Sequence, residues 1–438
     1  MQDVIQEKEQ AAVLALGLVL PGCDLATSNA ALAVLGPEKS AELLIRHKVS
    51  RIARARLAGL GADPVAAATA QLLADYIEPI DIRFLGSGEL LDLVARVAAE
   101  GGFGVRRMKG FSQRDRYPQG LIRDVGDIDL LVADYDAAWL LAEAFLDRGY
   151  IYPPHELPWF KGDLTGGLYG QVRLISPGRV ELPIDIHVGP YSVRHCGLMP
   201  MRTDLTAHIG GEPLPPVDPI DDFCCVIGNA AGDCFIDAKT VNDIVLALRA
   251  HPDPEALRAA VHPTLDAAAL LPFFATCLDR VHALCAPDPA LSAALDLLRP
   301  DVEPEPQPPL AAPNADHRIE VTIAHAGFAA ERVPGSSPAL TAAIVEGARR
   351  AYSSPSPLLV TELPYDDSRR ALPQLVRWNC VRLVPLTSTP AFAAHAFRLA
   401  GRTVVLATPE GQLVDAGAAG QFVPTVDFVL PSGLVGTP

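Results

Sequence analysis

Two short segments alternate apolar and acidic residues, and this alternation most constrains the fold of the chain. The first reads GDIDLLV and carries Asp127 and Asp129, and the second reads VELPIDIHV and carries Asp185 and His187. Successive side chains on a β-strand point to opposite faces, so each pair shares one face while isoleucine or leucine occupies the other. The pattern predicts two strands, each with an apolar face for a core and a polar face for chemistry.

The spacing of these acidic residues suits a divalent cation. Asp127 and Asp129 would lie about 7 Å apart along a strand, and a bound cation would relieve the repulsion between them. If the second strand pairs beside the first, about 4.8 Å away, Asp185 completes a cluster of three carboxylates. Such a cluster can hold two Mg²⁺ ions about 3.5–4 Å apart during a phosphoryl or nucleotidyl displacement. A solvated surface pair is the alternative for Asp127 and Asp129, and an edge-strand charge is the alternative for Asp185.

A Lys-Gly pair precedes the first acidic strand, in the segment MKGFSQRDRYPQGLIRD. A lysine can balance the charge of a phosphate group, and a glycine lets the backbone approach that group closely. Lys109 and Gly110 are therefore candidate phosphate-binding residues, and Ser112 adds a hydroxyl contact within the same turn. A plain turn glycine is the alternative for Gly110.

The order of these motifs resembles that of a known family. A Lys-Gly turn after a strand, an Arg-x-x-Gly-Asp-x-Asp strand, a helix and a later Ile-Asp-Ile-His strand are similar to the nucleotidyltransferase-like superfamily, in particular its bacterial branch of uncharacterised nucleotidyltransferases. The resemblance covers residues 89–248, with the motifs confined to 108–132 and 184–187. It implies an enzyme that transfers a nucleoside monophosphate (NMP) from a nucleoside triphosphate (NTP) to an acceptor, with Mg²⁺ as cofactor and two ions expected.

The resemblance also implies a role for each motif residue. It makes Asp127 and Asp129 catalytic metal ligands and Asp185 the third metal-binding carboxylate. In relatives this third carboxylate also activates the acceptor hydroxyl. Lys109 and Gly110 match the turn that holds the phosphates of the nucleotide.

Two further basic residues are candidates for nucleotide binding. Arg123 is either a phosphate ligand or the salt partner of Asp124 or Asp127, and the sequence leaves both readings open. Lys239 lies on a helix predicted over 237–249. In relatives a helix at this place packs beside the nucleotide, so the resemblance makes Lys239 a triphosphate contact, against the alternative of an ordinary exposed lysine.

The charge of the chain bears on its partners. The formal net charge is −16, and a long nucleic acid is disfavoured because its binding depends on Lys and Arg that neutralise phosphates. We therefore expect a small-molecule or peptide acceptor. The resemblance further implies ATP as the NTP, AMP as the transferred group and a place in specialised metabolism. The alternatives are a toxin-like transferase that modifies tRNA or protein, and a non-catalytic relative that binds a nucleotide or a partner.

The cysteines and the apolar segments indicate a cytoplasmic protein with no membrane span. The eight cysteines form no CxxC pair, which favours reduced thiols. The apolar run over 11–20 is too short to cross a bilayer. A zinc set of His187, His195 and Cys196 is disfavoured because no fourth ligand clusters with it.

High usage of Ala, Pro and Arg over Lys indicates a GC-rich bacterial genome.

The predicted fold class is an α+β nucleotidyltransferase core, a small mixed sheet flanked by helices, with an N-terminal helical region and a C-terminal α/β domain. The expected parts are a helical region over 1–103, the core over 104–200, a helical region that completes the nucleotide cleft over 201–299, a proline-rich linker over 300–316 and the C-terminal domain over 317–438. The C-terminal domain is expected to serve acceptor recognition, dimerisation or partner docking.

Periodicity predicts the individual elements. Helices are expected over 10–20, 38–60, 64–77, 89–100, 135–148 and 237–249, with another starting at Pro219 and one or two more within 254–298. Core strands are expected over 104–108, 127–132, 169–175 and 180–188, and a C-terminal strand over 380–385. Basic residues between Arg46 and Arg56 are expected to form a solvated helix face, or else to line the entrance for triphosphate or acceptor.

Overall fold

The computed structural model describes residues 2–20, 25–60, 63–118, 121–151, 159–162, 168–193, 197–206, 214–233, 235–285, 288–305, 338–339, 342, 381–386, 414–415 and 421–426. The chain divides into two compact units. Unit 1 comprises Met1–Leu85, Met108–Gly126 and Val217–Asn314, and unit 2 comprises Gly86–Arg107, Asp127–Pro216 and Ala315–Pro438. Both units contain segments that are far apart in the sequence. The domain boundaries expected from the sequence stay predictions.

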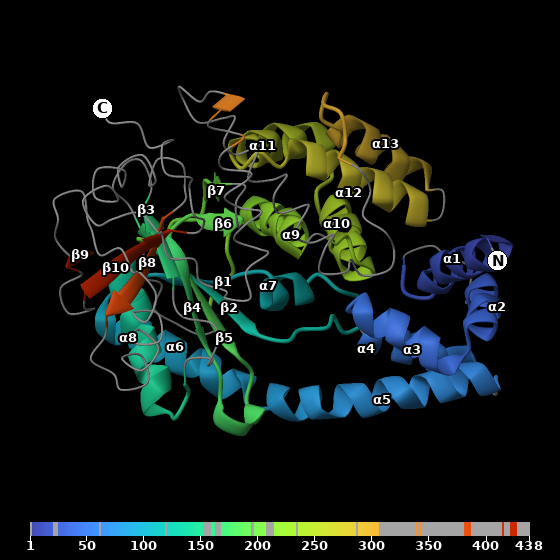
Figure 1. Ribbon diagram of the computed structural model, residues 1–438, viewed down its shortest axis with the longest axis horizontal. Helices are drawn as coiled ribbons and strands as arrows, with labels where there is room; N and C mark the ends of the chain where they lie inside the picture. Colours follow the sequence, from blue (N-terminus) through green and yellow to red (C-terminus); the bar gives the residue numbers. More distant parts are fainter. Residues whose placement is uncertain are drawn as a thin grey trace. The chain divides into compact units, whose positions relative to one another are not determined.

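Four strands of unit 2 form a mixed sheet (Figure 1). β1 (Val105–Arg107) pairs antiparallel with β2 (Ile128–Val132), and β2 pairs parallel with β5 (Ile184–Val188). β5 then pairs antiparallel with β4 (Leu168–Leu174). Every residue of β2 and β5 is buried, so these two neighbouring strands form the centre of the core of unit 2.

Most of the predicted core strands are confirmed. Those predicted over 104–108, 127–132 and 169–175 agree with the structure to within one residue at each end. The strand predicted over 180–188 is four residues too long at its start, because β5 begins only at Ile184. Pro183 lacks a backbone N–H and cannot donate to the ladder, which explains this late start.

The sheet continues beyond β4 through four further strands. β3 (Trp159–Gly162) pairs with β4, and β8 (Val381–Leu386) pairs with β3. β10 (Gln421–Val426) pairs with β8 and with β9 (Val414–Asp415). The strand expected over 380–385 is therefore confirmed as β8. Most of the remaining residues of the expected C-terminal domain, and most of the proline-rich linker, lie outside the described residues.

Two helices pack in unit 2 beside this sheet. α8 (Tyr135–Asp147) contacts β2, β4 and β5, while α6 (Ser87–Gly101) contacts α8 and β1 (Figure 1). The Asp134 side chain caps α8 by accepting the N–H of Ala137 at 2.9 Å. The fully buried Phe145 of α8 contacts the ring of Tyr150, with ring centroids 5.2 Å apart. This apolar packing stabilises the position of α8 in unit 2.

Unit 1 begins with α1 (Gln2–Leu16), α2 (Leu25–Leu35), α3 (Pro37–Arg46), α4 (Ser50–Leu57) and α5 (Pro64–Phe84). The single helix predicted over 38–60 is wrong, because it divides into α3 and α4. Lys48 adopts a backbone φ of 55° between them. Asp124 then caps α4 by accepting the backbone N–H of Ser50 at 2.6 Å. The capping residue is 74 positions away in the sequence, so local periodicity gave no sign of this break.

The basic residues of α3 and α4 make ion pairs within unit 1. Arg46 pairs with Glu42, Arg51 pairs with Asp81 and Asp124, and Lys48 pairs with Asp233 and Asp237. Arg54 and Arg56 are exposed. The expected solvated helix face is only partly present, because His47 is fully buried and the Arg51 side chain has 9% exposure. A role of the basic residues in lining an entrance stays a prediction.

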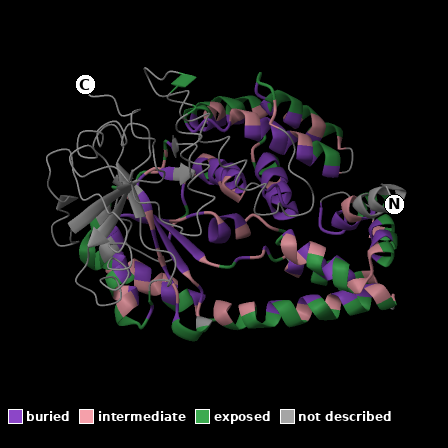
Figure 2. Cartoon of the chain, viewed as in Figure 1, coloured by how far each residue is buried: buried purple, intermediate pink, exposed green. Residues whose placement is uncertain are grey.

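The remainder of unit 1 is also helical. It consists of the short α7 (Gly110–Arg114) and of α9 (Pro219–Asp233), α10 (Ala238–Ala250), α11 (Pro254–Ala267), α12 (Leu271–Leu284) and α13 (Pro289–Leu298). The sequence predicted α9 and α10, but three helices rather than one or two follow α10. Figure 2 shows α9 and α10 almost entirely buried, whereas the outer side of α5 is exposed. None of the described helices combines the length and apolar character needed to span a membrane.

The packing of α8 can be tested with one buried and one exposed residue of the same helix. Phe145→Ala should lower the free energy of unfolding by about 3–5 kcal/mol, because the ring is fully buried and its removal leaves a cavity. Leu140→Ala, at a position with 43% exposure, should change it by less than about 0.5 kcal/mol. Urea unfolding followed by circular dichroism measures both values. Equal losses would show that α8 does not pack through Phe145.

Candidate functional site

The parallel pairing of β2 and β5 brings two predicted carboxylates side by side in unit 2. In this register Asp129 lies opposite Asp185, and Leu131 lies opposite His187. The strand alternation places Asp129, Asp185 and His187 on one face of the sheet. All three side chains are buried, with exposures of 5%, 4% and 7%. The sequence anticipated the pairing of these strands, and the structure confirms it.

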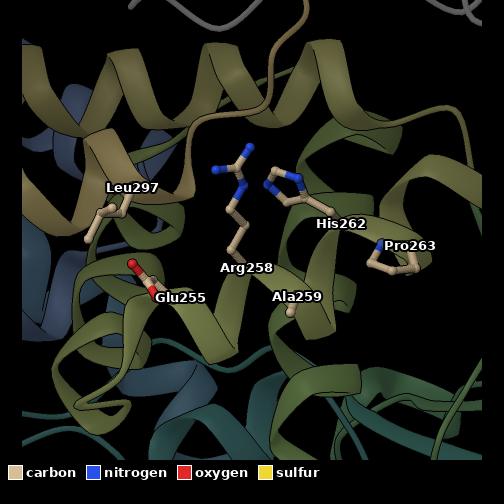
Figure 3. A pocket seen from close by; sticks show the side chains of 6 residues that line it. All are labelled: Glu255, Arg258, Ala259, His262, Pro263 and Leu297. Carbon is tan, nitrogen blue, oxygen red and sulfur yellow. The ribbon is translucent and has the colours of Figure 1, made fainter.

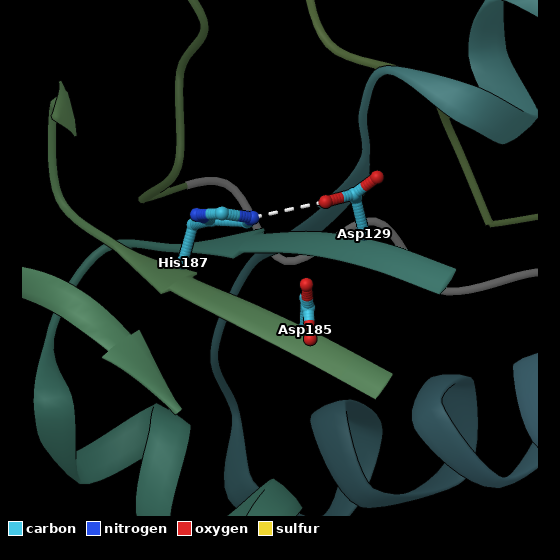
Figure 4. Close-up of side chains that lie close together, drawn as sticks. All are labelled: Asp129, Asp185 and His187. Carbon is cyan, nitrogen blue, oxygen red and sulfur yellow. Dashed lines mark hydrogen bonds and ion pairs between the residues drawn. The ribbon is translucent and has the colours of Figure 1, made fainter. Parts of the chain in front are cut away.

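Asp129, Asp185 and His187 form a group with metal-ligating chemistry (Figure 4). Each offers one ligand atom, and these atoms all lie within 4.8 Å of one another. Nε2 of His187 lies 3.0 Å from Oδ1 of Asp129. On the other side, Nη1 of Arg173 on β4 lies 3.5 Å from Oδ2 of Asp185. The group therefore combines two carboxylates and an imidazole with a nearby guanidinium.

The dimensions of this group fit one cation. Two oxygen ligands of the same Mg²⁺, each at about 2.0–2.1 Å, lie no more than about 4.2 Å apart, so a spread of 4.8 Å closes with small side-chain rotations. His187 has two available roles. It can ligate the ion directly, or it can orient the Asp129 carboxylate through their hydrogen bond, as outer partners of metal ligands do.

Asp127 is not a member of this group. It directly precedes the first residue of β2 and is half-buried, and the three clustered ligands are Asp129, Asp185 and His187. The structure thus brings two of the three predicted carboxylates into one group that could bind a metal. Metal ligation by Asp127, and with it a second ion, stays a prediction.

The sequence analysis did not include His187 among the site residues. The signal was present, because the alternation that selected Asp185 placed His187 on the same face. The one ligand role weighed for His187 from the sequence was a zinc set with His195 and Cys196, which was disfavoured. Those last two residues lie outside the described residues.

In unit 1, the Lys109–Gly110 turn has an uncommon backbone conformation. Lys109 precedes α7 with φ 50° and ψ −113°, a conformation that side-chain-bearing residues rarely adopt. Gly110 is buried, and a Cβ added there would lie 3.2 Å from Cγ1 of Val125. The turn therefore uses the small size of Gly110 for close packing and holds Lys109 under strain.

A buried carboxylate on α9 holds this turn. Oδ1 of Asp222 accepts the backbone N–H of Lys109 at 3.0 Å and the hydroxyl of Ser112 at 2.8 Å. Burial raises the pKa of Asp222 to about 6, and the nearby Arg116, the two hydrogen bonds and Arg123 oppose this rise. Ser112, predicted to contact the nucleotide, is thus engaged inside the protein, and its nucleotide contact stays a prediction.

Arg123 is paired with an aspartate that the sequence analysis had not considered as its partner. Its Nη2 and Nε donate to Asp243 on α10 at 2.7 and 2.9 Å, and both side chains are buried. Tyr117 donates its hydroxyl to the same carboxylate at 2.8 Å. Although burial disfavours the charge, Asp243 raises the pKa of Arg123. The sequence predicted Asp124 or Asp127 as the salt partner of Arg123, whereas the ion pair in the structure is with Asp243. A phosphate contact by Arg123 stays a prediction.

Lys239 is buried in the first turn of α10, so the alternative of an ordinary exposed lysine is wrong. Burial lowers the pKa of its ammonium, while Asp237 raises it and Arg123 and Lys48 lower it further. Its backbone N–H donates to the carbonyl of His47 at 3.3 Å. Its contact with a triphosphate stays a prediction.

One family of known proteins matches the part of the chain that carries the turn, the acidic strands and α10. The family model described as "Uncharacterised nucleotidyltransferase" matches residues 35–284, which is more than half of the chain. This chain belongs to the uncharacterised nucleotidyltransferase family. The match includes the Lys109–Gly110 turn, both acidic strands and α10. None of the curated proteins compared with the chain matches it.

The mixed sheet and its helices fit a nucleotidyltransferase core, so this part of the predicted fold class is confirmed. The α/β character of the C-terminal domain stays a prediction. Membership of the family also fits the buried Asp129–Asp185–His187 group, because nucleotidyltransferases use metal-bound carboxylates.

A surface cavity of about 420 Å³ lies elsewhere in unit 1 (Figure 3). Its lining residues are Glu255, Arg258, Ala259, His262, Pro263 and Leu297. Nε2 of His262 lies 2.8 Å from the carbonyl oxygen of Leu298, so this histidine joins α11 to the end of α13. The lining contains none of the predicted site residues, and we assign the cavity no role in nucleotide binding.

The strain at Lys109 can be tested through stability. Lys109→Gly should raise the free energy of unfolding by about 1 kcal/mol. The substitution relieves about 1–3 kcal/mol of backbone strain, which exceeds the cost of the larger conformational entropy that glycine loses on folding. Lys109→Ala keeps a Cβ atom and should give no such gain. Thermal and urea unfolding compare the two variants. Equal stability of both would show that the backbone of Lys109 is not strained.

The titration of Asp222 predicts a pH-dependent stability. Because the pKa is raised to about 6 in the folded protein, the contribution of this group is complete below about pH 4 and is lost as the pH rises through 6. Wild-type protein should lose on the order of 2–3 kcal/mol relative to Asp222→Asn between pH 4 and pH 7. Urea unfolding at several pH values measures this difference. Parallel pH profiles would contradict the raised pKa.

Proposed function

We propose that this protein is a metal-dependent nucleotidyltransferase that transfers NMP, with AMP as the expected group, from an NTP to a small-molecule or peptide acceptor. One observation carries the proposal: within the region matched by the family model, β2 and β5 pair so that Asp129 and Asp185 lie opposite one another on a buried face with His187. Two buried carboxylates and an imidazole at this spacing form a donor set for a divalent cation.

The proposed reaction is a displacement at the α-phosphorus of the NTP. The acceptor oxygen or nitrogen forms a bond to this phosphorus, the bond to the bridging oxygen of the β-phosphate breaks, and pyrophosphate leaves. A divalent cation, Mg²⁺ foremost, would be held by Asp129 and Asp185 and would stabilise the charge that develops on the phosphate oxygens. Asp185 orients the acceptor or accepts its proton, and Asp127 is the proposed additional ligand for a second ion.

The proposed phosphate contacts come from residues of unit 1. Lys109 supplies positive charge, and its strained backbone supports a functional role, because strain of this kind persists where the conformation itself is needed. Gly110 allows close approach of the phosphates. Lys239 is buried and has no ion pair of its own within the described residues, which supports its proposed role as a contact for an anionic group.

Other expectations about partners and location belong to the same proposal. The net charge of −16 favours a small or peptide acceptor over tRNA, and retention of Asp129 and Asp185 in one buried group weighs against a non-catalytic relative. A cytoplasmic location in a bacterium and a homodimer are also proposed.

Binding of NTP with and without Mg²⁺ tests the proposal without knowledge of the acceptor. By calorimetry, wild-type protein should bind one NTP, ATP foremost, more tightly in the presence of Mg²⁺. Asp129→Asn and Asp185→Asn should each remove this metal dependence, which we expect to appear as a loss of at least about tenfold in affinity. His187→Gln should weaken Mg²⁺ binding by about 10–100-fold, whether the imidazole ligates or orients.

Asp147→Asn provides a matched control, since it makes the same chemical change at an exposed carboxylate of unit 2. This variant should bind as wild type does. If wild-type protein binds no NTP at millimolar concentration, or if the Asp129 and Asp185 variants keep full Mg²⁺ dependence, the proposed function is wrong.

A further inference from the structure

The carboxylate of Asp222 holds the Lys109–Gly110 turn and the start of α7 together. Its Oδ1 accepts the Lys109 N–H at 3.0 Å, at the start of the turn. The same oxygen accepts the hydroxyl of Ser112, in the first turn of α7, at 2.8 Å. The Ser112 hydroxyl also lies 3.1 Å from the Lys109 carbonyl oxygen. Within unit 1, a side chain of α9 thus sets the path of a segment that is 113 positions earlier in the sequence.

Asp222 is a buried polar side chain that packing alone does not explain. Its exposure is 1%, and its second oxygen has no hydrogen bond among the described residues, with Nη2 of Arg116 3.5 Å away. A buried carboxylate without full hydrogen bonding destabilises the folded state, and an apolar residue of similar size would pack here at a lower cost in free energy. What an apolar residue would lack is the acceptor oxygen that Asp222 places between Lys109 and Ser112.

The conformation of Lys109 needs such a constraint. A backbone with φ 50° and ψ −113° is disfavoured for lysine and persists only where the surroundings over-determine it. The hydrogen bond from the Lys109 N–H to Asp222 is one such constraint. A second is the approach of Nη1 of Arg123 to the Gly110 carbonyl oxygen, at 3.5 Å.

We infer that Asp222 is a positioning residue for nucleotide binding, which holds the Lys109–Gly110 turn in the shape that receives the phosphates of the NTP. This inference rests on the proposed function. Asp222 acts through its hydrogen bonds to the Lys109 N–H and the Ser112 hydroxyl. Its action depends on where its acceptor oxygen lies, and the size and position of the side chain are therefore decisive.

Three substitutions of Asp222 separate the effect of the position of its acceptor oxygen from the effect of its charge. Asp222→Asn keeps an acceptor oxygen at the same place and should bind Mg²⁺–ATP within about threefold of wild type at pH 7.5. Asp222→Ala removes the acceptor and should lose about 10–100-fold in affinity, an effect comparable to loss of an outer partner in other sites. Asp222→Glu keeps the charge but moves the acceptor by one methylene, and should lose about as much as Asp222→Ala.

A control variant separates positioning from general loss of stability. Leu265→Ala removes buried packing on α11 and should destabilise unit 1 without changing the affinity for Mg²⁺–ATP at temperatures where it is folded. Calorimetry gives the affinities, and thermal unfolding shows that each variant is folded. If Asp222→Ala does not fold, the comparison of Asp222→Asn with Asp222→Glu still decides.

The outcomes distinguish the inference from the proposed function. Binding by wild-type protein and by Asp222→Asn, with a loss in Asp222→Ala and Asp222→Glu, supports the positioning role. Wild-type affinity in Asp222→Glu, or equal losses in Asp222→Asn and Asp222→Glu, would overturn the inference while the proposed function stands. Absence of NTP binding by wild-type protein would overturn both.

Discussion

The parallel pairing of β2 with β5 is the constraint on which the chemistry of this protein depends. Because the side chains of a strand alternate, a shift of one residue in the register would turn Asp185 away from Asp129 and place it on the apolar face. The isoleucine and leucine side chains of both strands are buried and fix the register through the hydrophobic core. The same interaction that stabilises the fold therefore brings the two carboxylates and His187 together.

In unit 1, buried polar contacts hold together segments that are far apart in the sequence, as the sheet does in unit 2. Asp243 fixes Arg123, Asp222 fixes the Lys109–Gly110 turn, and Asp124 caps α4. Each contact joins segments far apart in the sequence. In the Arg123–Asp243 pair both charges are buried, so loss of one partner would leave the other uncompensated. Such contacts favour a unique arrangement of the segment between β1 and β2, which carries the residues proposed to meet the nucleotide.

Strain and electrostatics point to the same segment. Lys109 keeps a backbone conformation better suited to glycine, and Asp222 stays a carboxylate in a site where burial favours its neutral form. A protein selected for stability alone would relieve both. Local conflicts of this kind concentrate at functional sites, because binding needs particular groups in particular places. The family match over residues 35–284 includes this segment together with the acidic strands.

The sequence by itself determined the strands, the faces on which Asp129, Asp185 and His187 lie, and the family, because period-two alternation and short motifs are local properties. It also indicated most helices from their apolar periodicity. Only the tertiary structure decided that Asp127 lies outside the clustered ligands, that the helix over 38–60 breaks, and that Arg123 pairs with Asp243. These features depend on partners many residues away in the sequence, and local patterns carry no information about which buried charges will meet.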